Sequence, residues 1–198
     1  MPAVTGSRAE ASERVRDAIV AATVRIVARE GVAAVTHRRV AAEAGVSLSS
    51  TTWHFVAKAD ILTAALRWTA RREVARIGAI ADRLGGPDFD PAAWAEELAD
   101  WLLEQVTGER DVAVALYRLQ IELLGSPEAR AVHREWGLSL QALGERVLAT
   151  SGTLTPELDT RLVVAALDGL RLSALSAGGQ DHEWLRPAVR RQLRALLG

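Results

Sequence analysis

The nine residues from Ser47 to Phe55 combine two kinds of side chain that rarely serve the same neighbour. Five of the first six carry hydroxyl groups, and the last three carry rings. Hydroxyl groups at the start of a projecting helix can hydrogen-bond phosphate oxygens or base edges of DNA, whereas rings at its end can pack against protein. The segment therefore predicts a short helix that changes neighbour along its length, from DNA to protein core.

The residues before this segment predict a helix-turn-helix. A helix capped by Thr36 is followed by the tight turn Gly45-Val46-Ser47, and Ser47 caps the next helix. Such a turn sets two short helices at a steep angle, so the first residues of the second helix can enter a major groove of DNA. Lys58 then opens a long helix.

The residues that we expect to contact DNA are polar, positively charged or apolar side chains at the starts of these helices and along the second one. They are Arg38, Ser47, Leu48, Ser49, Ser50, Thr52, Trp53, His54 and Lys58. We expect His54 and Lys58 to face phosphates, and Phe55 with one side of Trp53 to pack in the core. Taken singly, each has an alternative: serine and threonine at a helix start are most often only caps.

Charge and periodicity indicate how the chain is divided. The formal net charge is −1, but residues 1–80 carry 12 basic and 7 acidic side chains (+5), which leaves 12 and 18 (−6) for residues 81–198. Apolar residues recur at helical spacing throughout, and no segment alternates as a strand does. We predict an all-α fold of about nine helices, with a three-helix helix-turn-helix domain at residues 9–56 and a helical bundle at residues 57–198.

Caps and stops give the helix bounds. Asp90-Pro91, Ser126-Pro127 and Thr155-Pro156 each place a capping side chain before a proline suited to the first helical position. The predicted helices span residues 10–30, 58–84, 91–107, 110–124, 127–150 and 156–177, and a last one ends near Leu197.

Several function classes find no support in the sequence. The chain has no cysteine, and its four histidines show no metal-ligand spacing. It contains no phosphate-binding glycine-rich loop and no nucleophile motif, so we expect neither an enzyme nor a bound metal or cofactor. No signal peptide and no uncharged apolar stretch of about 18 residues is present, so we expect a cytoplasmic protein without a membrane partner.

The residues around the helix-turn-helix resemble a known family. The run from Ile19 through Gly31, "RRVAAEAGVS", "WHF" and "AKADIL" is similar to the N-terminal domain of the tetracycline-repressor (TetR) family of bacterial transcription regulators. The resemblance implies a DNA-binding domain followed by a helical domain that binds a small molecule and forms a homodimer. By the resemblance, Thr36 matches a helix cap that contacts phosphate. Family members usually have leucine and tyrosine where this chain has Thr51 and Thr52, so the tyrosine's phosphate contact passes to Thr52 or Trp53.

By this resemblance the helical bundle receives an unknown small-molecule effector. Aromatic residues with a few polar groups are typical of ligand pockets, although aromatics at helical spacing are usually core. The candidate pocket residues are Trp68, Trp94, Trp101, Tyr117, Gln120, Trp136, Asp168 and Arg171. The candidate residues of the dimer interface, where small side chains permit close helix approach, are Leu162, Ala166, Gly169, Leu170, Ser173, Val189, Leu193 and Leu196.

The predicted function is a ligand-responsive regulator, a repressor by family expectation, which binds double-stranded DNA at a palindromic operator and is released by its effector. An alternative is a helical small-molecule-binding or adaptor protein without sequence-specific DNA binding, which the missing tyrosine keeps open.

Overall fold

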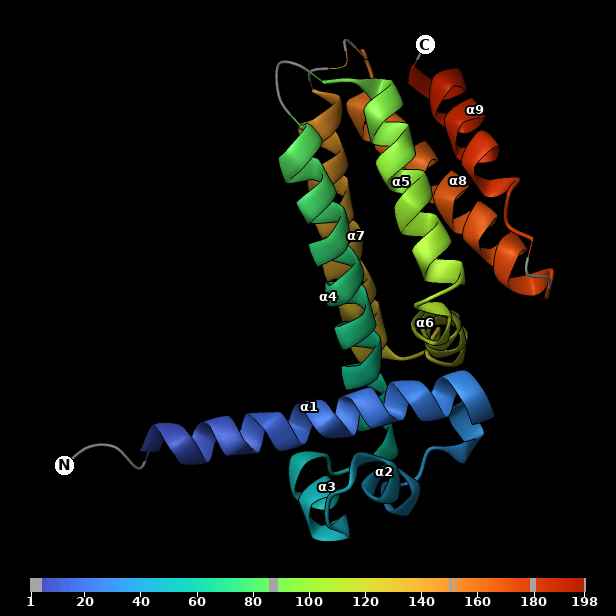
Figure 1. Cartoon of the computed structure of the whole chain (residues 1–198). Coiled ribbons are helices and arrows are strands. Elements are labelled where there is room, and N and C mark those ends of the chain that lie inside the picture. The colour runs from blue at the N-terminus through green and yellow to red at the C-terminus, as the bar shows by residue number, and fades with distance from the viewer. Residues whose placement is uncertain (1–4, 86–88, 150, 152, 179–180, 198) are drawn as a thin grey trace. The chain divides into compact units, whose positions relative to one another are not determined.

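Helices make up nearly all of the computed structural model of the chain, which describes residues 5–85, 89–149, 151, 153–178 and 181–197 (Figure 1). Over these residues it contains nine α-helices, one short 3₁₀ turn and no strand, so the all-α prediction is confirmed. The helices are α1 (Thr5–Glu30), α2 (His37–Ala44), α3 (Leu48–His54), α4 (Lys58–Leu84), α5 (Pro91–Val106), α6 (Arg110–Glu122), α7 (Pro127–Leu148), α8 (Pro156–Ser176) and α9 (Leu185–Leu197). Their bounds agree with the predicted ones within about two residues, except that α1 begins earlier than expected.

The chain divides into two compact units. One contains the residues up to Ala70 together with Asp111–Val132, and the other contains Arg71–Arg110 together with the residues from His133 onward. These units do not coincide with the predicted domains 9–56 and 57–198, because the first turns of α4 and nearly all of α6 belong with α1. Helix α4 runs without a break from one unit into the other.

The core of the first unit forms around the second half of α1. Its fully buried apolar side chains come from helices that are distant in sequence, and they include Ile19, Ile26, Val35, Val40, Ile61, Leu66, Ala115 and Leu119. Arg118 of α6 adds a polar contact, because its Nη1 donates to the carbonyl oxygens of Val27 at 2.7 Å and Ala28 at 2.9 Å. These carbonyls lie in the last turn of α1, where a cation and a donor are both favourable.

The turn between α2 and α3 has the expected geometry. Gly45 adopts the left-handed conformation (φ 67°, ψ 31°), and the N–H of Val46 donates to the carbonyl of Ala41 at 3.0 Å. This pattern satisfies the last carbonyls of α2 and reverses the chain within three residues. Ser47 follows in extended backbone and caps α3.

Two of the three predicted serine, threonine and aspartate caps before a proline are confirmed. Asp90 accepts from the N–H of Ala92 at 2.8 Å, and Ser126 accepts from the N–H of Ala129 at 3.2 Å. The prediction for Thr155 is wrong, because its side chain makes no cap hydrogen bond. Its hydroxyl instead donates to Asp159, at 3.2 Å from Oδ2.

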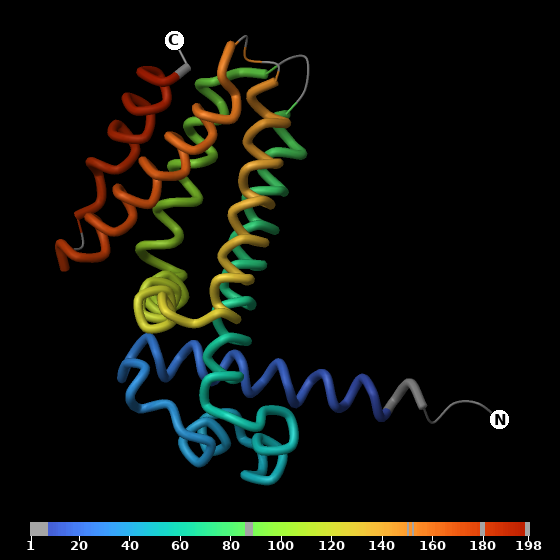
Figure 2. The backbone as a smooth tube through the Cα atoms, turned by 180° about the vertical axis from the view of Figure 1, so that it is seen from behind, coloured from blue at the N-terminus to red at the C-terminus, as the bar shows by residue number. Residues whose placement is uncertain are grey.

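In the second unit, α5, α8 and α9 lie side by side, as both ribbon views show (Figures 1 and 2). Their buried side chains form one core with the ends of α4 and α7. This core includes Ile80, Trp94, Leu98, Leu102, Leu148, Leu167, Leu185, Val189 and Leu193. Ion pairs reinforce it at the edge, where Glu96 of α5 accepts from Arg186 and Arg190 of α9. No helix among the described residues is long and apolar enough to cross a membrane.

Replacing Gly45 by alanine tests the turn. An added Cβ at Gly45 meets nothing within 4 Å, so the cost comes from the left-handed backbone alone and should be about 1 kcal/mol of unfolding free energy. The matched control is Gly137→Ala in α7, where an added Cβ also meets nothing within 4 Å. There alanine should stabilise by roughly 0.5–1 kcal/mol because it favours the helix. Urea denaturation followed by helical circular dichroism measures the unfolding free energy of both variants. A change in the same direction for both would contradict this account.

Candidate nucleic-acid interface and ligand pocket

The hydroxyl groups at the start of α3 hydrogen-bond to one another. The Oγ of Ser47 accepts from the N–H of Ser50 at 3.0 Å, and it lies 2.8 Å from the hydroxyls of both Ser49 and Ser50. Ser47 is therefore a helix cap first, which is the alternative that the sequence left open for it. Ser49 is exposed and Ser50 half-buried, so Ser49 is the more accessible of the two to a partner outside the helix.

Thr51 and Thr52, which replace the family's usual leucine and tyrosine, have different surroundings. Thr51 is fully buried, and its hydroxyl donates to the carbonyl of Leu48 at 2.8 Å. It thus fills a core position with its methyl group while its polar atom is satisfied within the helix. Thr52 is exposed, but its hydroxyl also donates backward, to the carbonyl of Ser49 at 3.1 Å. Its single proton is therefore engaged, which leaves the oxygen as an acceptor and not as a donor to phosphate.

The three rings that end the segment split between surface and core. Phe55 is buried, with the guanidinium carbon of Arg16 5.4 Å from its ring centroid, as expected for a core ring. The prediction that one side of Trp53 packs in the core is wrong, because 73% of this residue is exposed. Trp53 contacts the ring of His54 edge-on, at 4.5 Å between centroids. An indole at the end of α3 therefore presents its face and its N–H donor to solvent.

His54 is half-buried, and this changes its expected role. Burial, together with the nearby charge of Arg16, lowers the pKa of His54 below its usual value. The imidazole is therefore neutral at neutral pH, so it can donate one hydrogen bond but adds no charge to a phosphate-facing surface.

Three arginines of this unit converge on one carboxylate. Glu43 of α2 pairs with Arg25 and Arg29 of α1, both at 2.9 Å, and with Arg39 at 3.2 Å. Hydrogen bonds from Arg25 and Arg29 hold the pKa of Glu43 at about 2. These arginines help to hold α2 against α1. Arg38, the residue before Arg39, takes no part in the cluster and is exposed.

Lys58 and Thr36 are also positioned by backbone contacts. The Nζ of Lys58 lies 3.5 Å from the carbonyl of Ala33, in the segment that leads into α2. Thr36 accepts from the N–H of Arg39 at 3.1 Å and so caps α2. Both side chains belong to the start of a helix on the unit that carries α3, as the sequence predicted.

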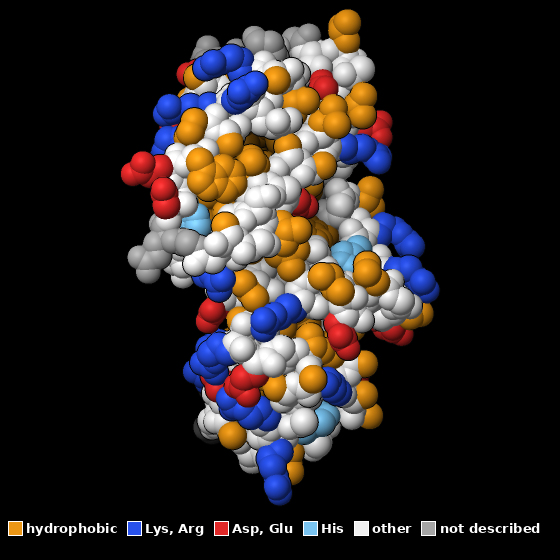
Figure 3. All heavy atoms as spheres, turned by 90° about the vertical axis from the view of Figure 1, so that its right-hand side faces the viewer, with side chains coloured by type: hydrophobic (Ala, Val, Ile, Leu, Met, Phe, Trp, Pro, Cys, Tyr) orange, Lys and Arg blue, Asp and Glu red, His pale blue; other side chains and the backbone are white. Residues whose placement is uncertain are grey.

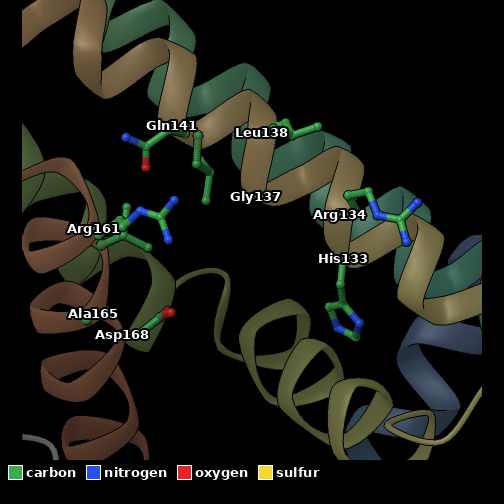
Figure 4. Close-up of a pocket in the computed structure, with 10 residues that line it drawn as sticks. His133, Arg134, Gly137, Leu138, Gln141, Arg161, Ala165 and Asp168 are labelled. Atoms are coloured by element: carbon green, nitrogen blue, oxygen red, sulfur yellow. The ribbon is translucent and has the colours of Figure 1, made fainter. Parts of the chain in front are cut away.

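The second unit contains an open pocket between α7 and α8, with a volume of about 480 Å³. Its lining is mainly apolar, and Figure 4 shows polar groups around it: Gln141 and Arg161 lie at one end, and the ring of His133 lies at the other. Asp168 points into the space between them. Apolar walls with a few polar groups are what a small organic ligand requires.

Beside this pocket lies a buried ion cluster. Arg171 of α8 is completely buried and pairs with Glu73 of α4 at 3.2 Å and with Asp168 at 2.5 Å. Its guanidinium also lies over the ring of Trp101, 5.5 Å from the centroid. Burial raises the pKa of Glu73, and the charge of Arg171 opposes that rise. Asp168 thus touches both the pocket and the cluster.

The predicted pocket residues do not all lie in this pocket. Asp168 lines it, and Trp136 of the same unit stacks on the pocket residue His133 at 6.2 Å between centroids. Trp101 and Arg171 belong to the ion cluster, whereas Trp94 is a core residue that packs on Phe89. The remaining three, Trp68, Tyr117 and Gln120, are half-buried residues of the first unit.

The sequence analysis did not identify Glu73 as a buried residue, although its spacing along α4 indicates a buried position. Leu66, Ala70, Glu73, Ile77 and Ile80 follow one another at helical spacing, so Glu73 occupies an apolar face. The neighbouring Val74 is only half-buried. A carboxylate at a core position requires a buried cation, and Arg171 is that cation.

The predicted dimer interface needs one correction. Val189 and Leu193 of α9 are buried in the core of their own unit, so they are unavailable to a partner. Of the α8 residues, Leu162, Gly169 and Ser173 are exposed, whereas Ala166 and Leu170, like Leu196 of α9, are half-buried. Further exposed apolar side chains of this unit are Leu138, Leu158, Leu172 and Trp184. Figure 3 shows exposed hydrophobic side chains among charged ones on one face of the molecule.

Two family models match the chain. The model of "Bacterial regulatory proteins, tetR family" covers residues 19–65, and that of "Tetracyclin repressor-like, C-terminal domain" covers residues 89–198. No protein of curated function matches the chain in sequence.

Solved structures of a multidrug binding protein and of a TetR-family member also match the chain. The multidrug binding protein EbrR, complexed with ethidium, is 36% identical over 90% of this chain and 97% of that chain (TM-score 0.67). The structure of EbrR with malachite green aligns at 34% identity and covers 92% of this chain and 98% of that chain (TM-score 0.69). A member of the TetR family from Streptomyces coelicolor A3, SCO1917, is 35% identical over 90% and 97% (TM-score 0.71).

The Glu43 cluster should make the stability of the first unit depend on pH. Because the pKa of Glu43 is lowered on folding, its contribution is fully present above the usual carboxylate pKa and is lost as pH falls toward about 2. The difference in unfolding free energy between the wild type and Glu43→Gln should therefore shrink from pH 6 to pH 2. Glu10→Gln, at an exposed carboxylate of α1, is the control. A difference that does not change with pH would contradict the ionic role of Glu43.

The buried cluster predicts a loss of the variant's cost in the same direction, toward low pH, but in a higher pH range. Arg171→Met leaves Glu73 buried without its cation and should cost about 3–5 kcal/mol at pH 8. At pH 5 the cost should be smaller, because the pKa of Glu73, already raised by burial, rises further and the carboxyl takes up a proton. Urea unfolding at the two pH values measures this. The double variant Glu73→Gln/Arg171→Met should recover part of the loss; no recovery would show that the ion pair is not what Arg171 contributes.

Proposed function

The chain belongs to the TetR family of bacterial regulatory proteins, and we propose that it represses transcription as a homodimer that is released from a palindromic operator by a small-molecule effector. The observation that carries this proposal is α3: a short, doubly capped helix after a left-handed glycine turn, with Ser49, Thr52 and Trp53 exposed. Polar side chains on such a helix are suited to base edges and phosphates in a major groove.

Within this proposal the DNA-binding domain spans residues 9–56 and the effector-binding and dimerisation domain spans residues 57–198. The DNA-contacting residues are those predicted from the sequence, with His54 as a neutral donor and with two further changes of role. Ser47 acts mainly as the cap that orients α3, and Trp53 takes the donor role of the family's tyrosine, because the proton of Thr52 is engaged within the helix. Arg38 and Lys58 supply the charge that phosphates attract.

Dimerisation would proceed through the exposed face of α8. Leu158, Leu162 and Leu172 are exposed there, and Gly169 and Ser173 lie on the outside of the same helix. Large apolar side chains next to small ones favour the close approach of two helices. A two-fold dimer then presents two copies of α3 to successive major grooves, roughly 34 to 36 Å apart, which is why the operator should be palindromic.

The effector should be an aromatic cation. EbrR has been crystallised with ethidium, malachite green and proflavin, which are planar or propeller-shaped aromatic cations. In this chain the second unit supplies rings and carboxylates in the same region: Trp101 and Trp136 are buried with their indole N–H groups unpaired among the described residues, and Glu73 and Asp168 are near Arg171. Rings and carboxylates favour an aromatic cation.

Helix α4 is the proposed route from effector to DNA. It carries Glu73, which pairs with Arg171, and it also carries Lys58 at its start. An effector that draws Asp168 or Glu73 away from Arg171 favours a second arrangement of α4. A coupling free energy of about 1–3 kcal/mol corresponds to a 5- to 150-fold loss of DNA affinity.

The recognition surface is tested by substitution. Lys58→Ala should weaken binding to all duplexes alike and reduce the slope of log affinity against log salt by about one unit. Ser49→Ala and Ser50→Ala should instead alter base preference. Fluorescence anisotropy with a duplex enriched from random sequence, and with its single-base variants, measures both effects. Equal and sequence-blind losses from all three variants would show that α3 is not the recognition helix.

Effector release has its own test. Malachite green at saturating concentration should lower the affinity of the wild-type chain for its selected duplex by 5- to 150-fold in a gel-shift titration. The uncharged leuco form of the dye is the matched control and should have little effect, because it lacks the charge that carboxylates attract. Release by both forms equally would argue for an apolar effector, and release by neither would reject an aromatic-cation effector.

A further inference from the structure

The first half of α1 contributes no fully buried side chain to the core, although Arg16 lies over the ring of Phe55. No side chain between Arg8 and Ala18 is buried, whereas Ile19 and the residues that follow it form the centre of the first unit. The family model also begins at Ile19. A helical segment of about three turns whose side chains are at most half-buried in its own unit gains little stability there, because packing of an apolar face is what normally stabilises a helix. Its retention as a helix therefore suggests an external contact.

A groove runs between this half of α1 and the recognition helix α3. It has a volume of about 500 Å³, and it is lined by Arg8, Ala11, Ser12 and Val15 of α1 and by Ser49, Ser50, Trp53 and His54 of α3. Its walls are mostly apolar, with Arg8 as the one charged side chain that lines it. The exposed indole of Trp53 forms part of the α3 side.

The charges of α1 are sorted by helix face. At 100° per residue, Arg8, Ala11, Ser12 and Val15 share the face that lines the groove. The three acidic residues of this half, Glu10, Glu13 and Asp17, fall on the opposite face. The groove therefore lacks carboxylates on its α1 side, although residues 8–18 as a whole carry three acidic and three basic side chains, the basic ones being Arg8, Arg14 and Arg16.

We propose that this groove receives the DNA backbone next to the major groove that α3 enters, with Arg8 contacting a phosphate and Trp53 packing against the adjoining deoxyribose. The chemistry fits, because a sugar–phosphate chain offers an apolar ring face and an anionic oxygen at alternating positions, and the groove offers an indole and a guanidinium. The inference rests on the proposed function, since DNA is the ligand in both.

Continuity with α3 identifies DNA as the occupant rather than a peptide or a second copy of the chain. Ser49 and Ser50 belong both to the groove and to the exposed start of α3. A DNA duplex whose major groove receives these serines carries its sugar–phosphate backbone past Trp53 and Arg8. A partner that occupied the groove alone would cover two of the residues that DNA requires. The contact also extends the interface beyond the helix-turn-helix, to a part of α1 that lies outside the family model.

Arg8→Ala is the direct test, and Arg14→Ala is its matched control. Both are exposed arginines of α1, but Arg14 does not line the groove. With the duplex that the wild type selects, Arg8→Ala should reduce the slope of log affinity against log salt by about one unit per bound protomer without altering base preference. Arg14→Ala should leave the slope unchanged. Phosphate ethylation interference should lose one position per half-site in Arg8→Ala only.

Substitutions of Trp53 give a second test of the groove contact. Trp53→Phe keeps an aromatic face and should retain most of the affinity, whereas Trp53→Ala should lose it several-fold. Unchanged slope and interference in Arg8→Ala, or equal losses in Arg8→Ala and Arg14→Ala, would overturn the groove contact while leaving α3-mediated binding intact. A change of oligomeric state in Arg8→Ala, seen by sedimentation, would also overturn it. Absence of any DNA binding by the wild-type chain would instead overturn the proposed function, and the groove contact with it.

Discussion

The carboxylate of Glu43 is the constraint on which the DNA-binding unit depends. It draws Arg25 and Arg29 of α1 and Arg39 of α2 to one point, and these ion pairs add to the apolar packing that holds the two helices together. Because the turn at Gly45 is short and hydrogen-bonded, the direction of α3 follows from the direction of α2. Arg25, Arg29 and Arg39 therefore pair with Glu43, and the positive charge for a DNA phosphate comes from residues outside this cluster.

A second carboxylate has the corresponding role in the other unit. Glu73 lies at a core position of α4 and is tolerated there because Arg171 is buried beside it, over the ring of Trp101. A buried ion pair adds little to stability compared with apolar packing, but breaking it is costly. The cluster therefore gives α4 a preferred position that a charged ligand can disturb. Since α4 begins at Lys58, the proposed coupling needs no contact beyond the helix itself.

Helix positions, the turn and the caps were predictable from the sequence because each depends on neighbours within a few residues. Gly45, Asp90 and Ser126 have the conformations or bonds that their types and spacing predicted. Properties that depend on distant neighbours were not predictable: the exposure of Trp53 and the burial of Val189 are set by which helix packs alongside. Glu73 is intermediate, because its spacing marked a buried face but only the structure supplied Arg171 as its partner.

Selection of DNA from random duplexes by the wild-type chain tests the central claim, that α3 reads a specific sequence in a two-fold assembly. The account predicts enrichment of a palindrome whose half-site centres are about one helical turn apart, roughly 34 to 36 Å. Enrichment of no sequence, even at low salt where phosphate contacts are strongest, would contradict it and would favour a ligand-binding protein that does not recognise an operator.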